Sequence, residues 1–137
     1  QVLAGEAHFL LQHRDLTDLV VVNARAGEGV LVPPGYGHVT INPGSEAIVM
    51  ANLVSSRFAS DYDFFERMQG AAYYACAGGE WRKNPRYGVV PALRFASPPA
   101  MPDLCGGGSI YRLVGCEECL DFLNHPERHR EQLGAPV

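Results

Sequence analysis

The sequence predicts an all-β domain, a sandwich or barrel of short antiparallel strands, with a short helical segment at the C-terminal end. The first half of the chain alternates short apolar runs with turn residues, and Gly27, residues 33–35 and residues 43–45 separate the later runs. No helical periodicity competes with this pattern before about Ser60. Short strands separated at this spacing by Gly and Pro are typical of antiparallel sandwiches and barrels.

The elements follow in order along the chain. Strands are predicted in five apolar runs, at residues 7–12, 19–23, 30–32, 38–42 and 47–54. Ser60 predicts the N-cap of a helix that contains Phe64 and Phe65 and ends at Gly70. A Gly-Gly turn then joins two more predicted strands, residues 72–77 and 80–83.

The last third of the chain has a different character. Residues 84–108 are rich in Pro and Gly and are expected to run irregularly over the surface. A last strand is predicted at residues 110–114, and short helices at residues 117–123 and 126–133. We therefore predict a β domain over residues 1–83 and a C-terminal extension over residues 84–137.

Composition limits the classes of function. The 137 residues carry a net charge of −4 and no Lys/Arg cluster, so the cationic patch that binds nucleic acid is missing. No apolar run approaches the ~20 residues that cross a bilayer, and no secretion signal precedes the first strand. A cytoplasmic protein is expected, with its four cysteines reduced.

The most informative stretch runs from Gly27 through Pro33 and Gly35 to His38 and Asn42. Gly27 permits a positive-φ turn, and Pro33 with Gly35 predicts a tight reversal between two strands. His38 then falls near the start of the next strand, with Asn42 on the same face. A neutral imidazole on a rigid strand is a good ligand for a divalent metal, although spacing alone also fits a histidine that only packs beside a turn.

This stretch matches the second cupin motif in full: Gly, five residues, Pro-x-Gly, two residues, His, three residues, Asn. The resemblance implies a cupin, or jelly-roll, barrel and makes His38 a metal ligand. It also implies one divalent ion, Fe, Mn, Ni or Zn. The family's other ligands, two His and a Glu, belong to a first motif of which only the closing residue, Gly5, has a counterpart here, so the chain is expected to start after that motif.

Further stretches resemble the cupin-type glucose-6-phosphate isomerases. Asp61-Tyr62 falls where those enzymes have His-Asp-Tyr-Gly, residues 84–87 read Asn-Pro-Arg-Tyr, and the tail is similar to a C-terminal extension of longer members. The chain departs from the family at three places. It has Gly-Tyr-Gly-His for Tyr-Trp-Ala-His, Val54 for an aromatic residue that contacts the substrate phosphate, and Ser60 for the His before the Asp-Tyr pair.

The resemblance implies interconversion of glucose 6-phosphate and fructose 6-phosphate, in which a proton moves between C2 and C1 of the open-chain sugar. A divalent ion would act as the Lewis acid, and the first motif's Glu as the base. The resemblance also implies that Tyr62 supplies the catalytic or substrate-contacting hydroxyl of this chain and that Tyr36 lines the pocket mouth. For both tyrosines, packing at a barrel rim is an equal alternative. A homodimer is expected by analogy.

Three alternatives remain open. One is a cupin dioxygenase or epimerase that acts on another substrate, which shares the fold and is separated only by the flanking resemblances. A non-catalytic cupin that binds a sugar or another small metabolite would keep the fold without the reaction. A structural zinc site is the third, because Cys116 and Cys119 have Cys-x-x-Cys spacing, with Cys105 before them and His125 and His129 after them. His8 and His13 are expected on opposite faces of the first long strand, with His8 the one that could face the barrel.

Overall fold

The computed structural model describes residues 1–98 and 109–133. Its centre is a four-stranded sheet in the order β4-β2-β3-β8. The strands are β2 (Glu6–His13), β3 (Leu19–Arg25), β4 (Tyr36–Ile41) and β8 (Arg94–Ala96). β2 pairs antiparallel with both β3 and β4, whereas β8 joins β3 in parallel. The sheet thus places β4, with its candidate ligand, at one edge.

Alternation of side chains divides this sheet into two apolar faces. One face carries Leu11, with Val20 opposite it on β3 and His38 opposite it on β4. We call this side the His38 face. Leu10 and Val21 lie on the other side and pack with Phe65 of the helix α1, so we call that side the α1 face. Leu10, Leu11, Val20 and Val21 are at most 1% exposed, so both faces are core.

Smaller elements cover each face. The remaining strands are β1 (Val2–Ala4), β5 (Val49–Met50), β6 (Tyr73–Ala75) and β7 (Trp81–Lys83). The helical elements are α1 (Asp63–Met68), η2 (Ile110–Leu113), η3 (Glu118–Leu120), α2 (Asp121–Asn124), η4 (Pro126–Arg128) and α3 (Arg130–Leu133). β1 pairs with β5, and β6 pairs with β7 as a hairpin.

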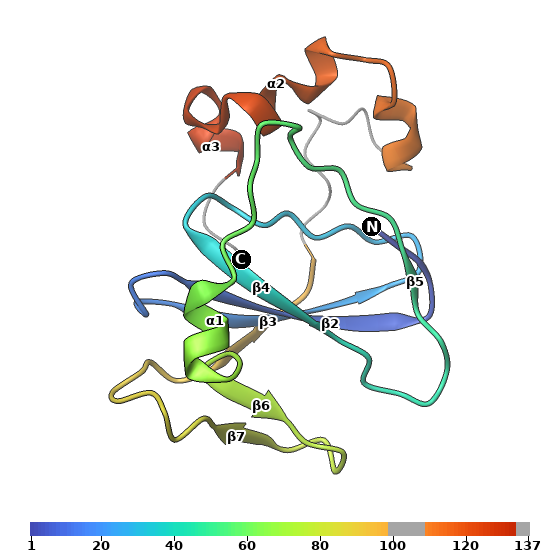
Figure 1. Ribbon diagram of the computed structural model, residues 1–137. Coiled ribbons are helices and arrows are strands. Elements are labelled where there is room, and N and C mark those ends of the chain that lie inside the picture. The colour runs from blue at the N-terminus through green and yellow to red at the C-terminus, as the bar shows by residue number, and fades with distance from the viewer. Residues whose placement is uncertain (99–108, 134–137) are drawn as a thin grey trace.

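Figure 1 shows how these elements are layered. The helix α1 and the β6–β7 hairpin lie on one side of the central sheet, and α2 and α3 lie on the other side. Val2 of β1, Val30 and Ile48 pack on the His38 face, which places the β1–β5 pair there as well. The C-terminal elements therefore lie on the same side of the sheet as His38.

The predicted fold class is confirmed, because the chain is mostly short strands with a few short helices, as in a small β-rich cupin-like domain. The runs at residues 7–12, 19–23 and 38–42 correspond to β2, β3 and β4, and the predicted hairpin corresponds to β6 and β7. Among the described residues no helix is long and apolar enough to cross a membrane.

Four local predictions were wrong. Residues 30–32 pack on the His38 face without joining a ladder, and the run 47–54 shortens to the two residues of β5. Residues 110–114 form the 3₁₀ helix η2, whose N-cap Ser109 accepts a hydrogen bond from the Tyr111 amide. Tyr62 takes the N-cap position of α1 in place of Ser60, because Asp61 accepts a hydrogen bond from the Asp63 amide.

The expected irregular run also contains a strand, β8, which extends the central sheet. The last part of that run, residues 99–108, which includes Cys105, lies outside the described residues. At the end of α1, Gln69 adopts a left-handed conformation and the Gly70 amide bonds to the Phe65 carbonyl, so the helix ends at Met68, two residues before the predicted glycine.

Candidate functional site

His38 lies on β4, opposite Leu11 of β2. Solvent reaches its side chain, yet the surrounding protein desolvates the ring and lowers the pKa of the imidazole. The desolvated ring favours the neutral form, which is the form that binds a metal ion. Its position on a strand between Gly37 and Val39 holds the backbone of this candidate ligand in the sheet.

The turns that flank His38 have the predicted conformations. Gly27 and Gly35 both have positive φ, +92° and +85°. The Tyr36 amide bonds to the Pro33 carbonyl, which closes the reversal into β4. Asn42 follows the strand and organises the next turn, since its side chain donates to the Glu46 carbonyl and accepts from the Gly44 amide. The motif thus builds the strand that presents His38.

Tyr36 shares the His38 face, two residues before His38 on the same strand. Its ring meets the His13 ring edge-on, with centroids 5.0 Å apart. Its hydroxyl donates to Asp18 Oδ2 at 2.9 Å, and Arg94 donates to both oxygens of that carboxylate at 2.8 and 2.9 Å. Burial first, and then the hydrogen bond to Asp18, raise the pKa of Tyr36 to about 12. The predicted substrate-contacting tyrosine therefore belongs to a charged cluster.

No described contact places Tyr62 beside Tyr36 and His38. It precedes the helix α1, and the helix packs Phe65 onto the α1 face, against Gly37. Its side chain is 63% exposed. The structure therefore groups Tyr36 and His38 on one face and leaves Tyr62 at the start of an element on the other, so the role of its hydroxyl stays a prediction.

The donors around His38 do not by themselves complete a metal site. A catalytic divalent ion generally takes about three protein ligands. In the described parts of the chain no group of three or more His, Cys, Asp or Glu side chains could hold a metal ion. His13, on the same face, has its Nδ1 within 3.0 Å of the Thr17 hydroxyl in the β2–β3 turn. His38 thus remains a single candidate ligand.

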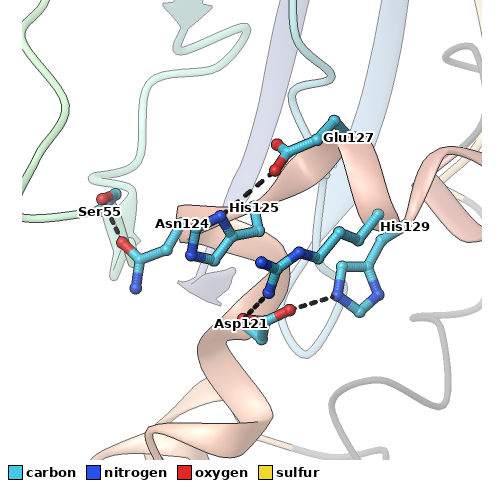
Figure 2. A network of polar contacts seen from close by, with 7 residues as sticks. Ser55, Asp121, Asn124, His125, Glu127 and His129 are labelled. Atoms are coloured by element: carbon cyan, nitrogen blue, oxygen red, sulfur yellow. Dashed lines mark hydrogen bonds and ion pairs between the residues drawn. The ribbon is translucent and has the colours of Figure 1, made fainter.

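The zinc alternative and the expectation of reduced thiols are both contradicted at Cys116 and Cys119. These two residues form a disulfide, so neither sulfur is a thiolate free to bind zinc. The two histidines of that alternative pair with carboxylates instead (Figure 2). His129 contacts Asp121 at 2.9 Å, and His125 contacts Glu127 at 3.3 Å.

The prediction that His8 and His13 lie on opposite faces of β2 is confirmed. The histidine that shares the face of His38 is His13, however, and not His8. The His8 ring stacks on Trp81, whereas the His13 ring meets Tyr36.

The Asn-Pro-Arg-Tyr segment has a structural role. Asn84 is fully buried, and its side chain donates to the carbonyls of Met68 and Ala71. Tyr87, 3% exposed, donates its hydroxyl proton to the Gly70 carbonyl and accepts a hydrogen bond from Gln12 of β2. This network of hydrogen bonds joins the end of α1 to the central sheet. The buried side chains of Asn84 and Tyr87 therefore serve the packing of the fold.

Sequence reasoning did not single out Asp18 or Arg94, although both bond in the cluster beside His38. Asp18 precedes β3, and Arg94 begins β8, 76 residues later. No local pattern marks an ion pair of that separation. The only available signal was a charged residue at the edge of each apolar run, which is common on surfaces.

The fold and the site define a small β-rich, cupin-like domain that presents one histidine, in the second-motif position, on a sheet face. The family model for glucose-6-phosphate isomerase (GPI) matches residues 1–91, more than half of the chain. The chain therefore belongs to the glucose-6-phosphate isomerase family, of the cupin type. Comparisons with curated proteins and with solved structures gave no match.

Proposed function

We propose that this chain forms part of a metal-dependent aldose–ketose isomerase that interconverts glucose 6-phosphate and fructose 6-phosphate. The observation that carries the proposal is the family match over residues 1–91, a range that includes the complete motif ending in His38 and Asn42. The family supports isomerase-type chemistry, and His38 lies where a ligand is needed, on a strand and with its pKa lowered.

In this proposal His38 supplies one neutral imidazole to a divalent ion, which is Fe, Mn, Ni or Zn. The remaining ligands, and the Glu that acts as base, are those of the family's first motif. Within this chain, Tyr36 forms a wall of the sugar-phosphate site beside His38. Tyr62 offers a hydroxyl to the substrate, and its 63% exposure leaves that group accessible. No further step is assigned to the metal, because the described residues complete no metal site.

The test is turnover of glucose 6-phosphate to fructose 6-phosphate by a protein that contains the first motif together with residues 1–137. We expect turnover that a chelator removes and that an added divalent metal restores. His38→Ala should abolish it and should reduce the bound metal per chain. His8→Ala is the matched control, because His8 lies on the same sheet but stacks on Trp81 across the α1 face; it should keep turnover within about threefold of wild type.

The second candidate is a non-catalytic cupin that binds a sugar or another metabolite. It is favoured by the changes at Val54 and Ser60, where the family has residues near the substrate. A folded, metal-loaded protein that binds glucose 6-phosphate in calorimetry but shows no turnover would establish this candidate and exclude the isomerase.

We also propose that the protein is a cytoplasmic homodimer. Leu3, Val49 and Met50 of the β1–β5 pair are apolar and between 38% and 50% exposed, which suits a face that a second copy covers. Sedimentation equilibrium would decide the association state, and a monomer at micromolar concentration would contradict this part of the proposal.

A further inference from the structure

The Asp18 carboxylate joins three separate elements of the fold. Asp18 lies in the turn between β2 and β3, Tyr36 begins β4 and Arg94 begins β8. The strands β4 and β8 are the two outer strands of the sheet, with β2 and β3 between them. An ion pair and a hydrogen bond at one carboxylate therefore connect both edges of the sheet on the His38 face.

The contacts have directional, paired geometry. Arg94 reaches Asp18 Oδ1 through Nε at 2.8 Å and Oδ2 through Nη2 at 2.9 Å, which is the two-pronged arrangement that guanidinium and carboxylate groups favour. The Tyr36 hydroxyl donates its only proton to Oδ2 at 2.9 Å. The arginine therefore fixes the carboxylate, and the carboxylate fixes the tyrosine.

The Tyr36 ring is also held from the side. It packs with Leu11 and Val20 of the His38 face and meets the His13 ring edge-on. With the hydroxyl proton already donated to Asp18, Tyr36 can offer a ligand its ring and an oxygen lone pair that accepts a hydrogen bond, but it cannot donate one. The guanidinium also balances the Asp18 charge, so that a sugar phosphate approaching this wall meets no net negative charge there.

We propose that Asp18 and Arg94 are positioning residues that hold the Tyr36 ring as the wall of the hexose-phosphate site next to His38. This inference rests on the proposed function, since it assigns their effect to binding of that substrate. Neither residue needs to touch the sugar, because both act through Tyr36.

The experiment uses the same protein as the turnover assay and measures kcat and KM for glucose 6-phosphate. Asp18→Asn removes the charge and one of the two acceptor oxygens, so the side chain can no longer accept from Arg94 and Tyr36 in the same arrangement, and KM should rise about 3- to 10-fold with kcat within about twofold of wild type. Tyr36→Phe should raise KM to a similar extent. Arg94→Gln removes the paired contacts that orient the Asp18 carboxylate toward Tyr36 and should raise KM to a similar extent.

The decisive comparison is Asp18→Asn in the Tyr36→Phe background. If Asp18 acts through Tyr36, the two changes should not add, and the double variant should have the KM of Tyr36→Phe within about twofold. If Asp18 has only a structural role, Asp18→Asn should raise KM in the Tyr36→Phe background as it does in wild type. Asp15→Asn is the matched control, because Asp15 lies in the same turn with its side chain 69% exposed, and it should leave KM unchanged.

Equilibrium binding of glucose 6-phosphate by calorimetry gives a second measure that does not need catalysis. A wild-type KM in Asp18→Asn, or full additivity with Tyr36→Phe, would overturn the positioning role while leaving the isomerase intact. If Asp18→Asn does not fold, a wild-type KM in the less disruptive Tyr36→Phe overturns it equally. Absence of turnover in the wild-type protein would overturn the proposed function, and the positioning role with it.

Discussion

Gly37 lies between Tyr36 and His38 on β4. Its lack of a side chain leaves room for the Phe65 ring of α1. A Cβ at this position would lie 2.7 and 2.9 Å from two carbons of the Phe65 ring, closer than carbon atoms approach in folded proteins. Phe65 belongs to the cluster that joins α1 to the central sheet. The Phe65 ring of α1 therefore lies closer to the strand than an Ala at position 37 would permit.

We therefore predict that Gly37→Ala destabilises the protein, although Ala usually favours a strand over Gly. Relief of the contact requires movement of the Phe65 ring, which should cost about 1–3 kcal/mol in the free energy of unfolding. Urea denaturation measures this cost. Gly78→Ala is the control, since nothing lies within 4 Å of a Cβ there. Adding Phe65→Leu should recover part of the loss, and an unchanged Gly37→Ala protein would refute the prediction.

The Asp18–Arg94 pair makes stability depend on pH. The hydrogen bond from Arg94 holds the pKa of the Asp18 carboxyl below its ordinary value, against a smaller opposing effect of burial. A carboxyl whose pKa is lower in the folded than in the unfolded chain stabilises the fold above the unfolded value, about 3.9. That contribution is lost as the pH falls through the folded pKa.

Asp18→Asn should accordingly lower the free energy of unfolding at pH 7 by about 1–2 kcal/mol, a value kept small because both side chains are partly exposed. The difference from wild type should shrink as the pH is lowered below about 4. Urea denaturation at pH 7 and pH 3 measures both values. A difference that stays constant, or one that grows in acid, would contradict the assignment.

At the scale of elements, the disulfide lies within the helical C-terminal segment, after η2. Cys116 and Cys119 are three residues apart; Cys116 precedes η3 and Cys119 lies within it. Such a small closed loop restricts the unfolded chain only modestly, so the disulfide should contribute at most about 2 kcal/mol. The reducing conditions of a cytoplasm normally reduce such a disulfide. Whether Cys116 and Cys119 are bonded therefore depends on the redox conditions of the compartment that holds the protein.

We predict that dithiothreitol lowers the melting temperature by a few degrees and makes Cys116 and Cys119 reactive toward a thiol reagent. Cys119→Ser should show the lower melting temperature already and should not respond to the reductant. Cys76→Ser is the control, because Cys76 is a free cysteine on a different element and its loss should leave the response intact. Full reactivity of both thiols before reduction would show that the disulfide does not form in solution.

The elements also show which parts of the fold a sequence can predict. The strands β2 and β3 form from apolar runs joined by a short turn, so their side chains alone specify the pairing. The strand β8 could not be predicted, because its three residues pair with β3 across a separation of 74 residues and lie between prolines. The run at residues 110–114 resembles a strand, but Ser109 caps a 3₁₀ turn, and Tyr111 and Val114 remain exposed.

At the scale of the whole molecule, the candidate site also combines features that local sequence predicts with features that depend on long-range contacts. The motif around His38 is local, so spacing predicted its turns and its strand correctly. The cluster of Asp18, Tyr36 and Arg94 depends on how the two outer strands are placed, which no stretch of sequence encodes by itself. The position of the C-terminal elements on the His38 side of the sheet is likewise a property of the folded chain (Figure 1).

Hydrogen bonds of Ile110 and Asn124 join those C-terminal elements to other parts of the described chain. The Ile110 amide donates to the Gln1 side chain at 3.2 Å, and the Ser55 hydroxyl donates to Asn124 Oδ1 at 2.5 Å (Figure 2). Ser55 belongs to the segment between β5 and α1, so Asn124 joins two parts of the chain that are distant in sequence. That second bond is exposed to solvent, which limits its strength.

We predict that Asn124→Ala loosens the segment of residues 109–133 without unfolding the sheet. Loss of an exposed hydrogen bond should raise the rates of amide exchange in η3 and α2 a few-fold, while β2 and β3 keep their protection, because their amides open only with the core. Hydrogen exchange followed by mass spectrometry distinguishes the two regions. Glu117→Gln, an exposed substitution in the same segment, should leave both unchanged. Faster exchange in β2 and β3 as well would mean that the C-terminal elements support the core, whereas no change anywhere would mean that Asn124 does not hold them in place.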